Sequence, residues 1–173
     1  MMPRRAAEVE ALEPYLPQGA RYLLYVGRKE TGKNAQLLID YFIEMKERGA
    51  APADIKLVIA GGGSFDDLQR PQALARGDIL DIGRLSEQDK RRLVRHALCL
   101  CQPSLNESFS IVLMEAWLLG TPVLVHADCA VTRYQTQRAG GGLYFSSAAE
   151  FAAVVAELAG NPRLCTALAQ SGR

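Results

Sequence analysis

The chain of 173 residues lacks the marks of several protein classes. It contains no run of 18 apolar residues, so no transmembrane helix is expected. Its first ten residues, Met-Met-Pro-Arg-Arg-Ala-Ala-Glu-Val-Glu, include no apolar stretch of the kind that secretory signals carry. Its 20 basic and 19 acidic side chains give a net charge of +1, which argues against a general binder of nucleic acid or membrane surfaces.

Patterns for disulfides and metal clusters are also missing. The chain has four cysteines, none in Cys-x-x-Cys spacing: Cys99, Cys101, Cys129 and Cys165. The two histidines lie far apart, with no pattern of metal ligands around them. We therefore expect buried free thiols in a cytoplasmic protein, packed in the core rather than bound to metal.

What the sequence does contain is an alternation of strand and helix patterns. Apolar runs of strand length lie at 22–26, 55–60, 79–82, 98–102 and 122–126, with a short edge strand at 143–145. Helical patterns lie at 37–48, 64–75, 86–96, 111–119, 147–158 and 161–170. N-cap signals begin four of these helices: Ser64 with Asp67, Ser86 with Asp89, Ser147 with Glu150, and Asn161 with Pro162. The polar stretch 127–141 predicts irregular chain.

This order predicts parallel strands joined by helical crossovers. The near-continuous apolar strands are typical of a sheet covered on both faces. We therefore predict one α/β, Rossmann-like, doubly wound domain over residues 21–173, preceded by a linker or N-terminal extension over residues 1–20.

In such folds ligands bind beyond the carboxyl ends of the strands. Four of the predicted strands run into glycine-rich, polar or charged loops, at 27–33, 61–64, 83–86 and 104–110. Because parallel strands end at the same edge of a sheet, we expect these four loops to face one rim and to form the site.

The loop after the first strand begins Gly27-Arg28 and ends at Lys33. A fixed guanidinium and a mobile ammonium on one loop could neutralise a pyrophosphate, and the alternative is a solvated basic turn. The loop is not a Walker motif: Gly27 and Gly32-Lys33 have its glycine spacing, but Lys33 is followed by Asn34 where the motif needs Ser or Thr.

The next two loops carry weaker signals. Gly61-Gly62-Gly63 has no Cβ atoms to block the close approach of a ligand, but a tight turn needs the same residues. Backbone groups of Arg84 and Leu85 could pair with the edge of a nucleotide base, or they could simply connect a strand to a helix.

Residues 103–123 carry the most specific pattern. The helix that begins near Ile111 is apolar on nearly every side, so we expect it to be buried. A carboxylate on such a helix needs a partner, and we interpret that partner as a ligand. The first turn offers free backbone N–H groups and a positive dipole end, a natural seat for phosphate: Phe109, Ser110, Ile111 and Val112.

Two acids, Glu107 and Glu115, flank this turn with seven residues between them. Their alternatives are a loop or capping carboxylate for Glu107 and a surface glutamate for Glu115. Eight residues of helix rise by about 12 Å. This is longer than the roughly 5–9.5 Å that a hydrolase pair needs. The spacing therefore favours two separate contacts with one extended ligand, such as a nucleotide sugar.

Three segments together resemble the C-terminal half of family 4 glycosyltransferases, which are retaining enzymes of the GT-B architecture. They are Val-Gly-Arg-x-x-x-x-Lys-Asn, Val-Ile-Ala-Gly-Gly-Gly, and Pro-Ser-x-x-Glu-Ser-Phe-Ser-Ile-Val-Leu-Met-Glu-Ala-Trp-x-x-Gly-Thr-Pro-Val. The resemblance covers about residues 20–170 and implies one half of a GT-B enzyme. It departs from the family at Ser110, where Gly is usual, and after the fifth strand, where a common Glu is absent.

The resemblance implies a domain that binds a nucleotide-diphosphate sugar, such as a UDP- or GDP-hexose, without a metal. Arg28 and Lys33 would contact the diphosphate, Glu107 would face the transferred sugar and Glu115 would hold the ribose. The remaining donor contacts would come from the loop glycines, the segment beside the base and the backbone of the helix start: Gly27, Gly61, Gly62, Arg84, Leu85 and residues 109–112.

The resemblance also implies a partner. GT-B enzymes have an N-terminal acceptor domain of similar size, which this chain does not include. We therefore expect a cytoplasmic hexosyltransferase fragment that is inactive alone and binds no nucleic acid. Any peripheral association with the inner face of a membrane would pass through the missing domain.

Two alternatives remain open at this point. One is another GT-B enzyme, a nucleotide-sugar epimerase or a phosphorylase. The other is a non-catalytic α/β interaction module, for example a flavodoxin-like receiver. Such a receiver would carry an acidic cluster after its first strand, where this chain has Gly27 and Arg28.

Overall fold

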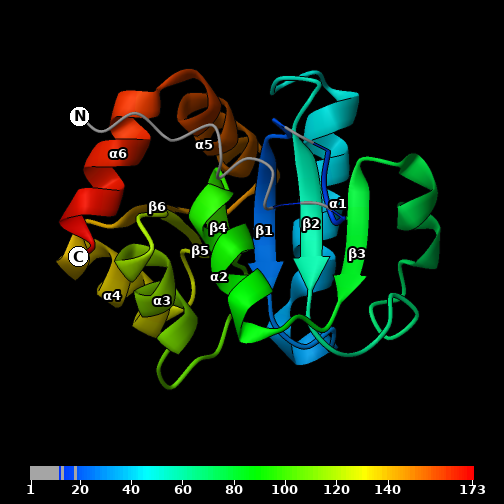
Figure 1. Cartoon of the computed structure of the whole chain (residues 1–173), viewed down its shortest axis with the longest axis horizontal. Helices are drawn as coiled ribbons and strands as arrows, with labels where there is room; N and C mark the ends of the chain where they lie inside the picture. The colour runs from blue at the N-terminus through cyan, green and yellow to red at the C-terminus, as the bar shows by residue number, and fades with distance from the viewer. Residues whose placement is uncertain (1–11, 13, 18) are drawn as a thin grey trace.

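The computed structural model describes residues 12, 14–17 and 19–173, and it contains a six-stranded, all-parallel sheet (Figure 1). The strand order is β3-β2-β1-β4-β5-β6, so the order reverses between β1 and β4. The predicted doubly wound fold is therefore confirmed. The strands are β1 (Tyr22–Val26), β2 (Lys56–Ala60), β3 (Ile79–Gly83), β4 (Cys99–Gln102), β5 (Val123–His126) and β6 (Gly142–Phe145).

Helices cover both faces of the sheet, with α1 behind it and α2 in front in Figure 1. The core on one face includes α1 and α5, and the core on the other includes α2 and α3. The helices are α1 (Ala35–Glu47), α2 (Glu87–His96), α3 (Ile111–Leu118), α4 (Ala130–Ala139), α5 (Ala148–Gly160) and α6 (Pro162–Ser171), with short 3-10 helices η3 (Thr31–Lys33) and η4 (Pro71–Arg76).

Strand β1 shows why the strands are apolar almost throughout. Successive side chains of a strand point to opposite faces of the sheet. Leu23 and Tyr25 are buried in the core on the α1 side, and Tyr22 and Leu24 in the core on the α2 side. Neither set faces water, so polar residues have no place in the strand.

The helix predicted at 64–75 is wrong. Ser64 and Asp67 exchange backbone-to-side-chain hydrogen bonds of 2.8 and 3.3 Å, as an N-cap pair would. The chain then takes a left-handed conformation at Gln69 and reaches Pro71, where only η4 follows. Proline lacks an N–H and its ring clashes with the preceding turn, so an α-helix could not continue through this position.

The irregular chain predicted over 127–141 is also wrong, because α4 occupies most of it. Its buried positions are Thr132 and Thr136. Since these inward-facing residues are polar by composition, the helical period of apolar residues is absent from the sequence.

Helix α3 is not buried on all sides, which corrects a third expectation. Leu113 and Trp117 pack against the sheet, but Ile111 is exposed and Leu118 has an exposed fraction of 72%. The sheet covers only one side of the helix, and the described residues leave these outward-facing side chains in solvent.

Part of the N-terminal segment packs against the domain. Leu12 and Leu16 are buried in the core on the α2 side of the sheet. The rest of the predicted extension falls largely on residues 1–11, 13 and 18, which lie outside the described residues. The domain boundary at residue 20 stays a prediction.

The cysteines agree with the expected free thiols. Cys99, Cys101 and Cys129 are buried and Cys165 is half-buried, and none of the four forms a disulfide. Over residues 12, 14–17 and 19–173, no helix is long and apolar enough to cross a membrane.

Candidate functional site

The loops at the carboxyl ends of the first three strands are bonded to one another through their backbones. Lys29 N donates to Gly62 O over 2.8 Å, and Gly61 N donates to Gly83 O over 2.7 Å. The loop after β4 joins them through Asn34, whose Nδ2 donates to Pro103 O over 3.0 Å. The four loops therefore lie along one rim, as expected from the parallel sheet.

The glycine turn packs against protein on each side. A Cβ on Gly61 would lie 1.9 Å from the carbonyl oxygen of Gly27, and a Cβ on Gly62 would lie 3.0 Å from Nε of Arg84. Gly61 and Gly63 also have positive φ values of 130° and 91°. Gly61 and Gly63 are thus required by their backbone conformation and by the contacts between loops, which is the tight-turn alternative, whereas Gly62 faces only the flexible end of Arg84. A donor contact at Gly61 or Gly62 stays a prediction.

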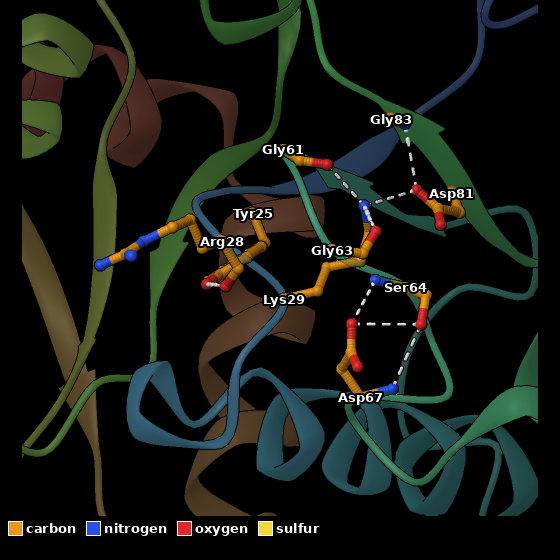
Figure 2. A network of polar contacts seen from close by, with 9 residues as sticks. All are labelled: Tyr25, Arg28, Lys29, Gly61, Gly63, Ser64, Asp67, Asp81 and Gly83. Carbon is orange, nitrogen blue, oxygen red and sulfur yellow. Dashed lines mark hydrogen bonds and ion pairs between the residues drawn. The ribbon is translucent and has the colours of Figure 1, made fainter.

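Arg28 has a fixed backbone and an exposed side chain. Its carbonyl accepts a hydrogen bond of 2.8 Å from the hydroxyl of Tyr25, whose pKa is raised mainly by burial and further by Glu30 and Glu107. Its guanidinium lies 3.3 Å from Glu30 and points away from the glycine turn (Figure 2). The side chain is therefore open to a ligand on the solvent side of the rim.

Lys33 and Glu107 meet, although 74 residues separate them in sequence. Lys33 Nζ lies 2.9 Å from Glu107 Oε1, and the exposed fractions of the two side chains are 30% and 11%. Gln102 Nε2 donates to the same carboxylate oxygen over 3.4 Å. A cation of the first loop and an acid of the fourth thus form one partly open charge pair.

Glu115 has a partner that the sequence did not reveal. Lys90 of α2 lies 3.3 Å from Glu115 and 2.9 Å from Glu87. Burial lowers the pKa of Lys90, but the two glutamates outweigh it, so the pKa is raised. Both predicted acids therefore pair with lysines inside the chain. The inference that their partner must be a ligand does not hold, and their donor roles stay predictions.

The start of α3 lies beside the pair of Lys33 and Glu107. Ser110 is the N-cap residue but makes no side-chain cap hydrogen bond, and its buried hydroxyl lies 3.5 Å from Gln102 Nε2. Phe109 and Ile111 are exposed and Val112 is half-buried. Because the first N–H groups of a helix have no acceptor within it, this end can offer donors and positive dipole to an anion.

Arg84 and Leu85 lie at the other side of the rim. The guanidinium of Arg84 lies over Gly62, and Leu85 packs at the edge of the core on the α2 side. The structure thus brings Arg84 to the glycine turn. A contact of this segment with a base stays a prediction.

The sequence reasoning missed a buried lysine at the centre of this rim. Lys29 Nζ lies 2.9 Å from Asp81 and donates to the carbonyls of Gly61 and Gly63 (Figure 2). One signal was available, because Asp81 places a carboxylate within the otherwise apolar strand of Ile79 to Ile82. A charge in such a strand indicates a nearby partner of opposite charge.

Among the residues that the structure describes, no group of three His, Cys, Asp or Glu side chains is placed to hold a metal ion. The expectation of a metal-free site stays a prediction. The cations that the site offers are Arg28, Lys33 and Arg84.

Comparisons with known proteins identify the family. The family model of glycosyl transferases group 1 matches residues 11–173. The D-inositol 3-phosphate glycosyltransferase of Salinispora arenicola (strain CNS-205) is 31% identical over 91% of this chain, which covers 38% of that relative. The chain thus spans well under half of this curated relative.

Solved structures agree on the fold. WaaG, a glycosyltransferase involved in lipopolysaccharide biosynthesis, matches with a TM-score of 0.73 and 22% identity over 100% of this chain and 46% of its own. Anabaena HepE, solved in complex with UDP, matches with a TM-score of 0.80 and 16% identity over 97% of this chain and 47% of its own. Because the family model matches residues 11–173 of the chain, the chain belongs to the glycosyl transferases group 1 and forms a Rossmann-like half of the GT-B architecture.

Proposed function

We propose that this chain is the donor-binding domain of a retaining hexosyltransferase that uses a nucleotide-diphosphate sugar. The observation that carries the proposal is the meeting of Lys33 and Glu107 beside the N-terminus of α3. A cation and a helix start can bind the two negative charges of a nucleotide-diphosphate sugar, and an acid can accept a hydrogen bond from a sugar hydroxyl. The family gives the class of reaction.

The diphosphate would lie between the first loop and α3. The exposed guanidinium of Arg28 and the ammonium of Lys33 are its cationic contacts, and the backbone of Phe109 to Val112 supplies N–H donors. Negative charge builds on the diphosphate as the sugar departs, and these groups stabilise it without a metal ion.

The two acids would contact the ends of the donor. Glu107, which is largely buried beside Lys33, faces the transferred sugar, and Glu115, held by Lys90, contacts the ribose. The segment Arg84-Leu85 lies beside the base. HepE has been solved with UDP and with UDP-glucose, which makes UDP the first nucleotide to test.

The rest of the enzyme would lie in a longer protein. Because this chain covers 38% of the relative from Salinispora, we propose an N-terminal acceptor domain as its partner. Association with the inner face of a membrane would pass through that domain, in the cytoplasm. The chain needs neither nucleic acid nor a metal for the role proposed here.

Isothermal titration calorimetry with UDP, GDP and ADP tests the proposal. We expect at least one nucleotide to bind the 173-residue chain. Lys33→Ala and Glu115→Ala should each weaken that binding about tenfold or more, as loss of a hydrogen bond to a charged group does. The matched control is Arg163→Ala, because Arg163 is exposed on α6, and it should bind as the unaltered chain does.

Three results would contradict the proposed function. If none of the three nucleotides binds, the non-catalytic interaction module becomes the better reading. If binding occurs but neither Lys33→Ala nor Glu115→Ala weakens it, the site is misplaced. Sugar transfer by this chain alone, measured with simple sugar acceptors, would contradict the proposal that catalysis needs the missing domain.

A further inference from the structure

Lys29 differs from every other cation of the rim in its burial. Its side chain has an exposed fraction of 1%, whereas its neighbour Arg28 is exposed. The ammonium lies 2.9 Å from Asp81 Oδ1, 2.6 Å from Gly61 O and 3.4 Å from Gly63 O. Figure 2 shows these three contacts converging on one nitrogen.

A buried ammonium is stable only when its charge and its N–H donors have partners. Asp81 supplies the opposite charge, and the two glycine carbonyls supply further acceptors. The three acceptors equal the three N–H donors of the ammonium. Lys29 therefore has no donor left for a ligand, and its burial keeps a ligand from reaching it.

These contacts join the ends of three strands. Lys29 follows β1, the carbonyls of Gly61 and Gly63 follow β2, and Asp81 lies in β3. Asp81 Oδ1 also accepts a hydrogen bond of 3.0 Å from the backbone N–H of Gly83. One side chain thus fixes the loops that hold the groups proposed to contact the diphosphate and the base.

Backbone contacts around Lys29 also hold the first loop against the glycine turn. Its own N–H donates to Gly62 O over 2.8 Å, and a Cβ on Gly63 would lie 2.8 Å from its carbonyl oxygen. The preceding carbonyl, of Arg28, is held by Tyr25. The main chain that carries Arg28 is therefore fixed on one side by Tyr25 and on the other by the glycine turn.

We propose that Lys29 is a positioning residue for donor binding. Through Asp81 and the glycine carbonyls it holds the 61–63 turn and the backbone of Arg28 in the arrangement that binds the nucleotide diphosphate. This rests on the proposed function, since it concerns the same ligand. Lys29 itself does not touch the donor.

A purely structural role is the competing explanation, and a pair of variants separates the two. Lys29→Met leaves Asp81 without its countercharge, so it should lower stability. Lys29→Met with Asp81→Asn removes both charges. Because Lys29 is buried and the side chain of Asp81 has an exposed fraction of 24%, removing both should cost less than removing the lysine alone. The double variant should regain stability, but it still lacks the hydrogen bonds from Lys29 to the carbonyls of Gly61 and Gly63.

Lys46→Met is the matched control. Lys46 Nζ also donates to two carbonyls, those of Ala53 and Ile55, and lies 4.0 Å from Asp78. These contacts are at the amino ends of β2 and β3, away from the rim that carries the site. Loss of Lys46 should therefore lower stability without changing nucleotide affinity.

The experiment combines urea unfolding, calorimetry with UDP, GDP and ADP, and amide hydrogen exchange on the 173-residue chain. We expect Lys29→Met to unfold at lower urea and the double variant to recover at least half of that loss. Both should bind the nucleotide at least tenfold more weakly than the unaltered chain, and both should exchange amides faster at residues 61–64. Lys46→Met should keep its affinity.

Two results would overturn the inference while leaving the proposed function intact. They are an unaltered affinity in Lys29→Met, or an affinity that returns with stability in the double variant. If the unaltered chain binds none of the three nucleotides, the proposed function fails, and the positioning role fails with it.

Discussion

At each end of the sheet, a lysine binds two backbone carbonyls and lies near a carboxylate. At the carboxyl end, Lys29 binds two carbonyls after β2 and a carboxylate of β3. At the amino end, Lys46 of α1 binds two carbonyls before β2 and lies near Asp78, which precedes β3. In each case one lysine joins the second strand to the third.

The two lysines differ in burial and in the closeness of the acid. Lys29 has an exposed fraction of 1% and lies 2.9 Å from its carboxylate, whereas Lys46 has an exposed fraction of 10% and lies 4.0 Å from its own. Coulomb energy rises as distance and local dielectric fall. The carboxyl-end lysine is therefore the more strongly coupled of the two, at the end where parallel sheets bind ligands.

The largest loss of stability should come from substituting Lys29. Lys29→Met leaves a carboxylate whose side chain is 24% exposed beside an apolar side chain, so we expect a loss of about 2 kcal/mol, below the roughly 3–5 kcal/mol of a fully buried pair. Lys46→Met keeps Asp78 near Arg76 at 3.2 Å, so we expect a loss of about 1 kcal/mol. Urea unfolding of the two variants gives both values. Equal losses would mean that burial does not distinguish the two ends.

The sequence predicted the parts of the fold whose signals are local. Ser86, Ser147 and Asn161 cap α2, α5 and α6 with hydrogen bonds of 3.0, 3.2 and 3.1 Å. Each signal needs only the three residues that follow it. The same signal at Ser64 misled, because Pro71 prevents a helix there, and α4 was missed because it buries threonines instead of apolar residues.

For the site, the sequence predicted which loops share one rim, but not which of their side chains are buried. Parallel topology brings Lys33 to Glu107 from positions 74 residues apart, and the motif named both. No local pattern separates Lys29 from Arg28, although one is buried and the other is exposed. Asp81 indicates that a cation lies near it, but Gly61 and Asp81 are distant in sequence from both residues, so the choice of Lys29 could be found only once the strands were placed.

A smaller effect on stability should come from the pair of Lys33 and Glu107. Lys33 and Glu107 are partly open to solvent, and a double-mutant cycle of Lys33→Met and Glu107→Gln should give a coupling of about 1 kcal/mol in unfolding. The same cycle on Lys29 and Asp81 should give at least about twice that. A coupling for Lys33 and Glu107 as large as that of Lys29 and Asp81 would show that this pair also stabilises the fold.

The smallest effect should come from an exposed pair at the amino end of the sheet. Arg21 donates to both carboxylate oxygens of Asp54, over 2.5 and 2.6 Å. These hydrogen bonds lower the pKa of Asp54 below its ordinary value, against a weaker opposing effect of burial. The unfolded chain thus binds the proton more tightly than the folded chain, so stability from this group is present above the ordinary pKa. It is lost as pH falls through the lowered pKa.

Asp54→Asn tests this sign. Melting temperatures of the variant and the unaltered chain, measured from about pH 7 down to about pH 2, should differ slightly at the upper end and converge at the lower end. The difference at neutral pH should be smaller than that caused by Lys33→Met, because both partners here are exposed and screened by solvent. A gap that widens as the pH falls would reverse the sign. A loss at neutral pH as large as that caused by Lys33→Met would show that burial of the cation does not rank the charge pairs from Lys29 through Lys33 to Arg21.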